Sequence, residues 1–360
     1  MNHQPAFLPA VALVGPYPPP AGGMSVLVQA LDDRLRSRGV PVESVPTQAG
    51  SRKSRYALTG DDFSRMARIL ARLYRRRGNF GVVNVHVNSG LSFLALALPL
   101  AGFCKALGKA LVVTYHGGGA QAFFDGPAGH TLPLLKAMAT VTVQSGYLEQ
   151  VFAGLGVKTT VIPNFVTLPL LPRDPQPGRI LVNRNFHPIY RVDTVIDALA
   201  LLTKSHPHAR LAVAGGGPLR GELESRARDR GIGDRVEFLG SLGREDMARE
   251  LSKAQVFVNP STVDNTPNSV IEALCMGLPI VTTGVGGIPF LVKDGVSALV
   301  TPPADPKAIA AAIVRILDDE NLASRLSQAA RAQAGCYDPG VITDQWIRLF
   351  ANLTPPAKSL

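Results

Sequence analysis

Short apolar runs alternate with amphipathic stretches along most of the chain, a pattern typical of an α/β fold with parallel strands. The runs are rich in Val, Ile and Leu, as buried strands are, and helical periodicity fills most of the intervals between them. The pattern therefore predicts two similar α/β units in series. The predicted strands are residues 10–15, 82–87, 110–116, 139–145 and 158–164, followed by 179–185, 209–217, 235–240, 254–261 and 278–284.

A proline-rich segment marks the boundary between the two units. Residues 163–179, "PNFVTLPLLPRDPQPGR", hold five prolines and have no helical periodicity, which favours an interdomain linker. A chain of 360 residues is also longer than one hydrophobic core usually serves. We expect an N-terminal domain at 1–163, a C-terminal domain at 164–340, and a final helix and tail at 341–360 that pack back on the N-terminal domain.

Charge is concentrated in the first half of the chain. Residues 1–165 hold 16 Lys and Arg against 7 Asp and Glu, so they carry nearly all of the formal net charge of +10. In the densest part, residues 64–78, apolar side chains repeat at helical spacing beneath six arginines. A solvated surface helix explains this pattern, and so does a helix lying against anionic lipid head groups. Nucleic acid is the weakest of the three readings, because no zinc-ligand spacing and no interleaved aromatic residues accompany the arginines.

Cysteine usage and hydropathy bear on the compartment. The three cysteines form no CxxC pair, which favours a reducing, cytoplasmic location, and the first 20 residues do not resemble a signal peptide. The apolar run at 91–104 has 14 residues including Pro99, so it is too short to span a bilayer and predicts a buried helix.

Candidate ligand-binding residues follow the predicted strands, because ligands of open α/β sheets bind beyond the carboxyl ends of strands. Gly22 and Gly23 precede a helix, where backbone N–H groups can approach a phosphate without a Cβ in the way. His116 ends a strand and precedes three glycines. Arg184 ends another strand, and its planar guanidinium suits phosphate oxygens. The segment "VAGGGPLRGEL" matches a dinucleotide fingerprint too weakly to predict NAD binding.

The segment 261–289, "STVDNTPNSVIEALCMGLPIVTTGVGGIP", joins two carboxylates to a helix start. Asn268 and Ser269 begin the predicted helix, whose free N–H groups can receive a diphosphate. Asp264 lies just before this start and Glu272 one turn beyond it. Carboxylates repel phosphates, so we expect these two to accept hydrogen bonds from sugar and ribose hydroxyls. A nucleotide-sugar offers hydroxyls on both sides of a diphosphate.

These residues resemble those of the retaining glycosyltransferases of family 4, which have the GT-B fold. The similarity is strongest at 254–300, with "NPS", Asp264 and Glu272 separated by seven residues, "EALCMGLP" and "GVGGIP". Weaker matches follow in the family's order, namely "PPPAGGMS", "TYHGGG", "VQSGYL", "VIPN", "AGGGPLR" and "VEFLG". The resemblance implies two Rossmann-like parallel-sheet domains facing a central cleft.

The resemblance also implies roles for individual residues around a nucleotide-sugar donor. Gly22 and Gly23 would lie beside the diphosphate, and His116 would reach the donor sugar near the reacting centre. The remaining roles fall in the second unit. Arg184 would neutralise phosphate charge together with the helix start at Asn268 and Ser269, Asp264 would hold donor-sugar hydroxyls, Glu272 would hold the ribose, and the backbone from Phe238 to Gly240 would contact the base.

Two departures from the family pattern concern the donor. Asp264 stands where the family usually has Glu, and Tyr190-Arg191 stands where many members have a phosphate-binding Lys-Gly pair. Either Arg191 replaces the lysine or Tyr190 donates a hydrogen bond to a phosphate oxygen. No Asp-x-Asp pair occurs, so we expect no metal cofactor and stabilisation of the leaving group by arginine and the helix end. Asp125 is a candidate acceptor contact.

The implied activity is metal-independent, retaining transfer of a hexosyl group from a UDP- or GDP-sugar to a glycan or lipid-linked acceptor, in cell-surface polysaccharide biosynthesis. A lipid-linked acceptor and peripheral contact with an anionic membrane at its inner face would explain the basic first half, and no nucleic acid partner is expected. One alternative is another sugar-nucleotide enzyme of the same fold, such as an epimerase. Another is a noncatalytic membrane-surface protein, which would leave His116, Arg184, Asp264 and Glu272 without a task.

Overall fold

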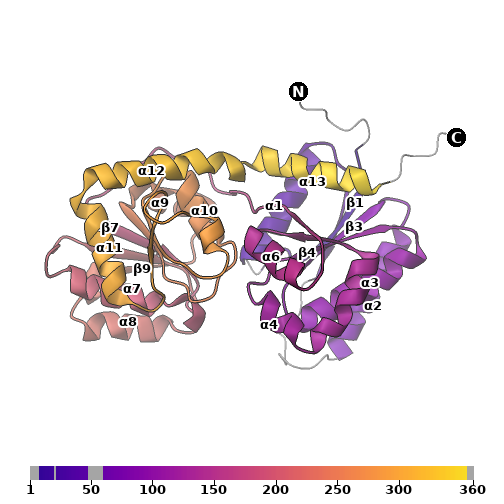
Figure 1. Ribbon diagram of the computed structural model, residues 1–360, viewed down its shortest axis with the longest axis horizontal. Helices are drawn as coiled ribbons and strands as arrows, with labels where there is room; N and C mark the ends of the chain where they lie inside the picture. Colours follow the sequence, from indigo (N-terminus) through magenta and orange to yellow (C-terminus); the bar gives the residue numbers. More distant parts are fainter. Residues whose placement is uncertain (1–7, 20–21, 48–59, 355–360) are drawn as a thin grey trace. The chain divides into compact units, whose positions relative to one another are not determined.

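The chain forms two compact units in the computed structural model, which describes residues 8–19, 22–47 and 60–354. One unit comprises Met1–Asn164 with Pro339–Leu360, and the other comprises Phe165–Asp338. Each is a six-stranded sheet with helices packed against it (Figure 1). Every pair of neighbouring strands in both sheets is parallel, which confirms the predicted α/β class.

The first unit has the strand order β2-β1-β3-β4-β5-β6. Its central strands are buried along their whole length, because helices cover both faces of a parallel sheet. The strands are β1 (Val11–Gly15), β2 (Val42–Pro46), β3 (Val82–Val87), β4 (Ala110–Tyr115), β5 (Thr140–Val143) and β6 (Thr159–Val161). The helices are α1 (Gly23–Ser37), α2 (Gly60–Arg75), α3 (Leu91–Ala106), α4 (Ala120–Asp125), α5 (Leu132–Met138), α6 (Gly146–Gly154) and α13 (Pro339–Leu353).

Helix α13 belongs to the first unit although it ends the chain. It packs on α1, where Arg38 Nη2 lies 2.7 Å from Asp344 Oδ1. Its Trp346 is buried, with the indole ring 5.4 Å from the ring of Phe350 and 6.3 Å from that of His86 on β3. The tail expected after this helix falls outside the described residues from 355 onward.

The second unit has the strand order β12-β11-β10-β7-β8-β9, in which the direction of winding reverses between β7 and β10. Such a reversal is where ligands of open α/β sheets bind. The strands are β7 (Arg179–Asn183), β8 (Arg210–Ala214), β9 (Val236–Gly240), β10 (Val256–Asn259), β11 (Ile280–Thr283) and β12 (Leu299–Thr301). The helices are α7 (Val192–Leu202), α8 (Arg220–Asp229), α9 (Arg244–Lys253), α10 (Asn268–Cys275), α11 (Pro306–Asp318) and α12 (Glu320–Ala334).

The proline-rich segment 163–179 was predicted to be an interdomain linker. Most of it instead packs on the second unit. The boundary between the units falls after Asn164, and the rest of the segment packs on the second unit. Phe165 and Val166 are buried. Arg173 donates to the carbonyl oxygens of Gly277 and Ala254, at 2.9 and 2.7 Å. These contacts attach the segment to the second unit although it has no regular secondary structure.

Of the twelve strands in the described residues, ten were predicted and two were not. Strand β2 has only two buried residues, separated by Glu43 and Ser44, and ends in a proline, and β12 has three residues, so neither produces an apolar run. The predicted helix at 91–104 is α3, with Phe93, Ala97, Leu100 and Cys104 fully buried on one face. No helix in the described part of the chain combines the length and apolar character needed to cross a bilayer.

Candidate functional site

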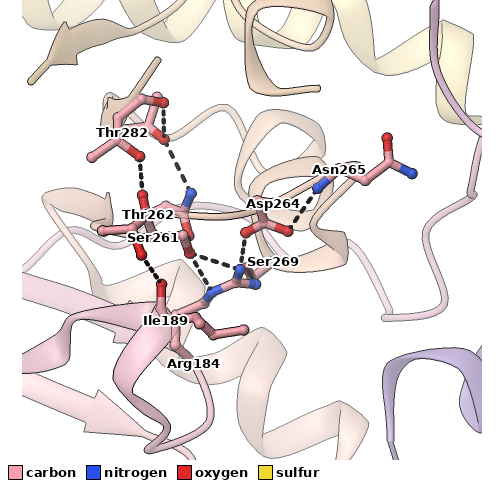
Figure 2. A network of polar contacts seen from close by, with 10 residues as sticks. Arg184, Ile189, Ser261, Thr262, Asp264, Asn265, Ser269 and Thr282 are labelled. Carbon is pink, nitrogen blue, oxygen red and sulfur yellow. Dashed lines mark hydrogen bonds and ion pairs between the residues drawn. The ribbon is translucent and has the colours of Figure 1, made fainter. Parts of the chain in front are cut away.

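Arg184 is the centre of a polar cluster at the point where β7 and β10 end side by side. It follows β7, and Ser261 and Asp264 follow β10. The guanidinium Nη2 is paired with the Asp264 carboxylate, and Nε and Nη2 donate to Ser261 Oγ at 3.1 and 2.8 Å. Figure 2 shows these groups converging on the guanidinium. The predicted cation and the first predicted carboxylate are therefore direct partners.

Two further contacts fix the guanidinium plane. The ring of Tyr190 lies over it, with the ring centroid 4.3 Å from Cζ, a cation–π contact. The second contact is with α10, where Ser269 Oγ in the first turn lies 3.5 Å from Nη1. Burial lowers the pKa of Arg184 to about 10, so the guanidinium still carries its charge at neutral pH. The result is a cation held beside a helix start.

Glycines let the surrounding loops pack directly on this cluster. A Cβ on Gly286, where φ is +53°, would lie 2.0 Å from the carbonyl oxygen of Asp264, and one on Gly287 would lie 2.1 Å from that of Asn265. Likewise, a Cβ on Gly215 would lie 2.1 Å from the carbonyl oxygen of Arg184. The "GVGG" and "AGGG" segments therefore pack against the backbone of Arg184 and of Asp264 with Asn265. This close packing explains the glycines, so they need not indicate a dinucleotide-binding loop.

Helix α10 begins at Asn268, as predicted, with Pro267 as its N-cap residue. The fixed φ of proline suits this position, and the first N–H groups of a helix have no carbonyl partner within it. Glu272 lies one turn into α10 and is buried. Burial raises the pKa of its carboxyl to about 8, and Asn183 Nδ2 is 3.5 Å from its Oε2. A carboxyl held this way gains from any hydroxyl that donates to it.

Tyr190 and Arg191 were alternatives for a phosphate contact, and the structure separates them. Arg191 has a left-handed backbone, with φ of 46°, at the start of α7. Its guanidinium donates to the Asp193 carboxylate, from Nε to Oδ1 at 3.0 Å and to Oδ2 at 3.3 Å, and from Nη2 to Oδ2 at 2.9 Å. Tyr190 instead lies against Arg184. Of the two residues, Tyr190 is the one in contact with the polar cluster.

The residues predicted to contact a base lie at the end of β9. Phe238 packs edge-on against Phe186, with centroids 6.2 Å apart, and Arg220 lies over its ring at 5.9 Å. Gly240 has a φ of +71°, and its carbonyl oxygen accepts from the Gly215 N–H at 2.8 Å. These contacts join the β9 end to the loop that supports Arg184.

In the first unit, Gly22 and Gly23 form the start of α1. Gly22 is the N-cap residue, and its N–H donates to Ser25 Oγ at 2.8 Å. A Cβ on Gly22 would meet only Ser25 Oγ, at 3.8 Å, so packing within the described residues does not require glycine there. The loop before it is anchored by Tyr17, whose hydroxyl donates to the buried Asp32 carboxylate at 2.8 Å.

His116 directly follows β4, as predicted, and contacts a second histidine. Its Nε2 is 3.0 Å from Nδ1 of His86 on β3, and the two rings stack with centroids 5.3 Å apart. Burial lowers the pKa of His116 to about 4, so its ring is neutral at neutral pH. The first of the three following glycines has a packing reason, because a Cβ on Gly117 would lie 2.7 Å from Ser89 Oγ.

Asp125 offers no such contact. It is exposed at the end of α4, where Gln121 Nε2 donates to its Oδ1 at 2.8 Å. Among the described residues, no hydrogen bond connects it to His116.

Sequence reasoning missed the residues that support the predicted ones. Ser261, fully buried, and His86 are direct partners of Arg184 and His116. A signal was available for His86, because polar residues within an otherwise apolar buried strand need partners, and β3 contains Asn84 and His86. Within the described residues, no group of three or more His, Cys, Asp and Glu side chains is arranged to hold a metal ion.

Family models match both halves of the chain. Residues 171–333 match the model described as Glycosyl transferases group 1, and residues 21–168 match Glycosyltransferase Family 4. The first of these ranges contains the Arg184 cluster and Glu272, and the second contains Gly22, Gly23 and His116.

Curated relatives match part of their own length. An exopolysaccharide phosphotransferase of Streptomyces coelicolor is 29% identical over 61% of this chain and 24% of its own. An alpha-D-kanosaminyltransferase of Streptomyces kanamyceticus is 31% identical over 45% and 42%. A lipopolysaccharide core biosynthesis glycosyltransferase of Rhizobium meliloti is 30% identical over 49% and 48%. The chain thus spans less than half the length of each of these three relatives.

Solved structures match almost the whole chain. The crystal structure of Anabaena HepE in complex with UDP has a TM-score of 0.76 at 18% identity, covering 96% of this chain and 100% of that one. Sucrose-phosphate synthase from Thermosynechococcus elongatus has a TM-score of 0.75 at 22% identity, covering 96% and 99%. At these identities the similarity concerns the fold.

Proposed function

Because the chain belongs to the family 4 glycosyltransferases, with the group 1 domain in its second half, we propose that it transfers a sugar from a nucleotide-sugar to a glycan or lipid-linked acceptor with retention of configuration. Its fold is the GT-B fold that the sequence resemblance implied. The donor is a UDP- or GDP-sugar, and the solved structures of the relative HepE in complex with UDP and with UDP-glucose favour UDP. Several relatives act in surface polysaccharide biosynthesis by name, and we assign this chain to the same kind of pathway.

One observation carries the proposal. Arg184 and Asp264 are paired beside the start of α10, and the buried Glu272 lies one turn further along the same helix. A cation beside a helix N-terminus suits a diphosphate. The two carboxyl groups suit hydroxyls on either side of it. This order of groups corresponds to sugar, diphosphate and ribose in a nucleotide-sugar.

Each group has a task in the reaction. Arg184, with the N–H groups of Asn268 and Ser269, stabilises the charge that develops on the leaving diphosphate, an electrostatic contribution that needs no protein nucleophile. Asp264 accepts hydrogen bonds from hydroxyls of the transferred sugar, and Glu272 accepts from the ribose. The backbone between Phe238 and Gly240 contacts the base.

The bond changes occur on one face of the sugar. The acceptor oxygen bonds to the anomeric carbon as the bond from that carbon to the diphosphate oxygen breaks. The acceptor's proton passes to the departing phosphate, which balances the charge it gains. Arg184 lowers the energy of this departure because its positive charge lies where the negative charge forms.

For the first unit, the family resemblance supports phosphate contact by Gly22 and Gly23 and sugar contact by His116. Among the described residues, a Cβ on Gly22 would meet only Ser25 Oγ, which supports an approach of phosphate to the start of α1. His116 provides a neutral ring for a sugar hydroxyl. We propose that no metal cofactor takes part, because an arginine and a helix start supply the positive potential in its place.

Helix α2 supports a membrane-associated acceptor. Arg68, Arg72 and Arg75 of α2, and Arg76 and Arg77 in the turn after it, are exposed together with Phe63 and Tyr74, whose exposed fractions are 67% and 53%. Ile69 and Leu73 hold the opposite side of the helix in the core. Basic and aromatic side chains on one exposed helical surface suit anionic head groups. We propose that the protein works at the inner, cytoplasmic face of a membrane on a lipid-linked acceptor.

The test is to titrate the protein with UDP-, GDP- and ADP-sugars and to measure its Tm at each ligand concentration. A ligand that binds the folded protein raises Tm as its concentration increases relative to Kd. We expect one nucleotide class to raise Tm in the presence of EDTA, and Arg184→Gln and Glu272→Gln to reduce that shift. Arg228→Gln, an exposed arginine on α8, is the control. Absence of a shift with every nucleotide-sugar would contradict the proposal, and a shift that requires Mg²⁺ would contradict its metal-independent part.

A further inference from the structure

His86 is a buried titratable residue to which the proposed reaction gives no task. It lies on β3 with an exposed fraction of 4%, and its ring centroid is 5.3 Å from that of His116 and 6.3 Å from that of Trp346. Both of its ring nitrogens have partners. Nδ1 is 3.0 Å from His116 Nε2, and Nε2 is 3.3 Å from Asn84 Nδ2.

The partners of His86 belong to a chain of hydrogen bonds that crosses three strands. Thr142 on β5 donates its hydroxyl to Thr114 Oγ on β4 at 2.9 Å. Thr114 in turn donates to Asn84 Oδ1 on β3 at 2.7 Å. All of these side chains are buried, so each polar atom depends on its neighbour for a partner.

The direction of this chain determines which nitrogens carry protons. Because Thr114 donates to Asn84 Oδ1, the amide nitrogen of Asn84 faces His86 and donates to its Nε2. A neutral His86 then carries its proton on Nδ1 and donates to His116 Nε2. His116, with Nε2 accepting, carries its own proton on Nδ1. Within the described part of the chain, that nitrogen has no hydrogen-bond partner.

We propose that His86 is a positioning residue that holds His116 as its neutral, Nδ1-protonated tautomer, so that His116 meets its ligand as a hydrogen-bond donor. The inference concerns the first unit alone, and only the identity of the ligand, a sugar oxygen, rests on the proposed function. Since Nε2 is occupied by His86, His116 cannot act as a base through that nitrogen.

The electrostatics of the pair agree with this arrangement. Burial lowers the pKa of His116 to about 4 and holds the pKa of His86 well below its usual range, and the proximity of His116 adds to the effect on His86. Both rings are therefore neutral at neutral pH. When two neutral imidazoles form a hydrogen bond, one ring nitrogen donates and the other accepts. The Asn84 amide, by donating to His86 Nε2, makes His86 Nδ1 the donor and His116 Nε2 the acceptor.

Nitrogen-15 NMR of histidine side chains tests the tautomer without any substrate. Long-range proton–nitrogen correlations distinguish a protonated Nδ1 from a protonated Nε2, and His116→Gln identifies the His116 signals. We expect the Nδ1-protonated form of His116 in the wild-type protein. The Nε2-protonated form, or a protonated ring at neutral pH, would overturn the proposal whatever ligand the protein binds.

Two variants test the origin of the tautomer. Thr114→Val keeps the β-branched shape but removes the hydroxyl that orients Asn84, so we expect a second His116 tautomer to appear. His86→Asn places an amide nitrogen close to the position of Nδ1 and should keep the wild-type tautomer, whereas His86→Leu should not. His208→Leu, at an exposed position of the second unit, is the control. An unchanged His116 spectrum in Thr114→Val or His86→Leu contradicts the proposal.

Kinetics test the consequence for transfer. We expect His86→Leu to lower kcat about tenfold, the value of one neutral hydrogen bond, and His86→Asn to restore most of it. A structural defect alone would not be repaired selectively by an amide. Equal kcat values for wild type and His86→Leu would contradict the positioning role. If no nucleotide-sugar serves as donor, the proposed function fails, while the NMR result still decides the tautomer.

Discussion

Arg184 and Asp264 are ion-paired across the ends of β7 and β10, with side-chain exposed fractions of 10% and 12%. The cation proposed to bind phosphate and the carboxylate proposed to bind sugar hydroxyls are therefore ion-paired with each other before a ligand binds. A diphosphate has to share the guanidinium with Asp264. The sugar hydroxyls have to share the carboxylate with Arg184.

Asp264→Asn should separate binding of the nucleotide from binding of the sugar. The substitution removes a negative charge close to the phosphate position, so we expect UDP without a sugar to bind about fivefold more tightly, for a gain of roughly 1 kcal/mol. Transfer from the UDP-sugar should fall, because an amide accepts hydroxyl protons less well than a carboxylate. Isothermal titration with UDP measures the gain in affinity, and a transfer assay with the UDP-sugar measures the loss of activity.

The matched control is Asp193→Asn, which removes the carboxylate that pairs with Arg191 rather than with Arg184. We expect it to leave UDP affinity within about twofold, since surface ion pairs contribute little. Weaker UDP binding in Asp264→Asn than in the wild type would mean that the carboxylate positions Arg184 more than it competes with phosphate.

Glu272 should make the stability of the second unit depend on pH. Burial raises the pKa of its carboxyl from 4.5 to about 8, so between these values the folded chain holds a proton that the unfolded chain has released. Stability therefore falls as pH rises through this window, by at most about 1.4 kcal/mol per pH unit. Glu272→Gln should flatten this dependence and raise Tm relative to the wild type, most of all near the upper end of the window.

Thermal unfolding of both proteins across the window measures the difference, with the exposed Glu222→Gln as control. We also expect a UDP-sugar to bind more tightly as pH rises toward the pKa of Glu272 in the ligand-free protein. The reason is that ribose hydroxyls donate hydrogen bonds preferentially to the ionised carboxylate. Parallel stability curves for wild type and Glu272→Gln would show that the carboxyl is ionised in the folded protein throughout the window.

Much of the second unit's site was predictable because it follows from strand ends and a helix start. The helix at Asn268 was predicted from Pro267 and the turn residues before it, and α10 begins there. Arg184 and Asp264 were expected to serve different parts of a ligand. Their pairing depends on β7 and β10 being neighbours, although 80 residues separate the two side chains in sequence. No local pattern contains that information.

The first unit shows the same limit. His116 was singled out from the end of its strand, but its partner His86 was not, because a contact across neighbouring strands depends on register. The parallel register that places His86 opposite Thr114 is set by tertiary packing. The three glycines after His116 were noted only as a glycine-rich loop beside a candidate ligand contact, whereas the first of them, Gly117, has a steric reason in Ser89.

Tyr190 rather than Arg191 should affect nucleotide binding. The ring of Tyr190 covers the guanidinium of Arg184, and Arg191 is bound to Asp193. We expect Tyr190→Ala to weaken binding of the UDP-sugar about five- to tenfold through loss of the cation–π contact, and Tyr190→Phe to keep most of it. Arg191→Gln should change affinity less than twofold, in line with a partly exposed ion pair. If Arg191→Gln has the larger effect, Arg191 is the replacement for the family's lysine.

Gly286→Ala should destabilise the second unit and displace Asp264. Its Cβ would lie 2.0 Å from the carbonyl oxygen of Asp264, at a φ of +53°. Gly295 is a matched control, because its φ is +69° and a Cβ there meets nothing within 4 Å. Gly295→Ala therefore has only the cost of the left-handed backbone, about 1 kcal/mol. We expect Gly286→Ala to cost roughly 2 kcal/mol more and to lower UDP-sugar affinity. Equal losses in urea unfolding would mean that the loop can move away without strain.

Neutralising the exposed arginines of α2 and the turn after it should weaken membrane binding and leave donor binding intact. Each arginine near an anionic surface contributes about 1 kcal/mol, so Arg75→Gln, Arg76→Gln and Arg77→Gln together should lower the partition onto phosphatidylserine vesicles about a hundredfold. Arg77 also lies over the ring of Tyr74, at 4.4 Å, so the loss extends to the aromatic contact with the interface.

The control for α2 is a triple variant with the same change in net charge in the second unit, Arg228→Gln, Arg249→Gln and Arg325→Gln, all at exposed positions. Vesicle sedimentation should separate the two triple variants if binding depends on the position of the arginines, and both should respond equally to the UDP-sugar. Equal loss of vesicle binding in both would mean that net charge alone attracts the protein to lipid. In that case the arginines of α2 would attract lipid no better than arginines elsewhere on the surface, through a long-range attraction that salt screens. Helix α2 would then have only a structural role.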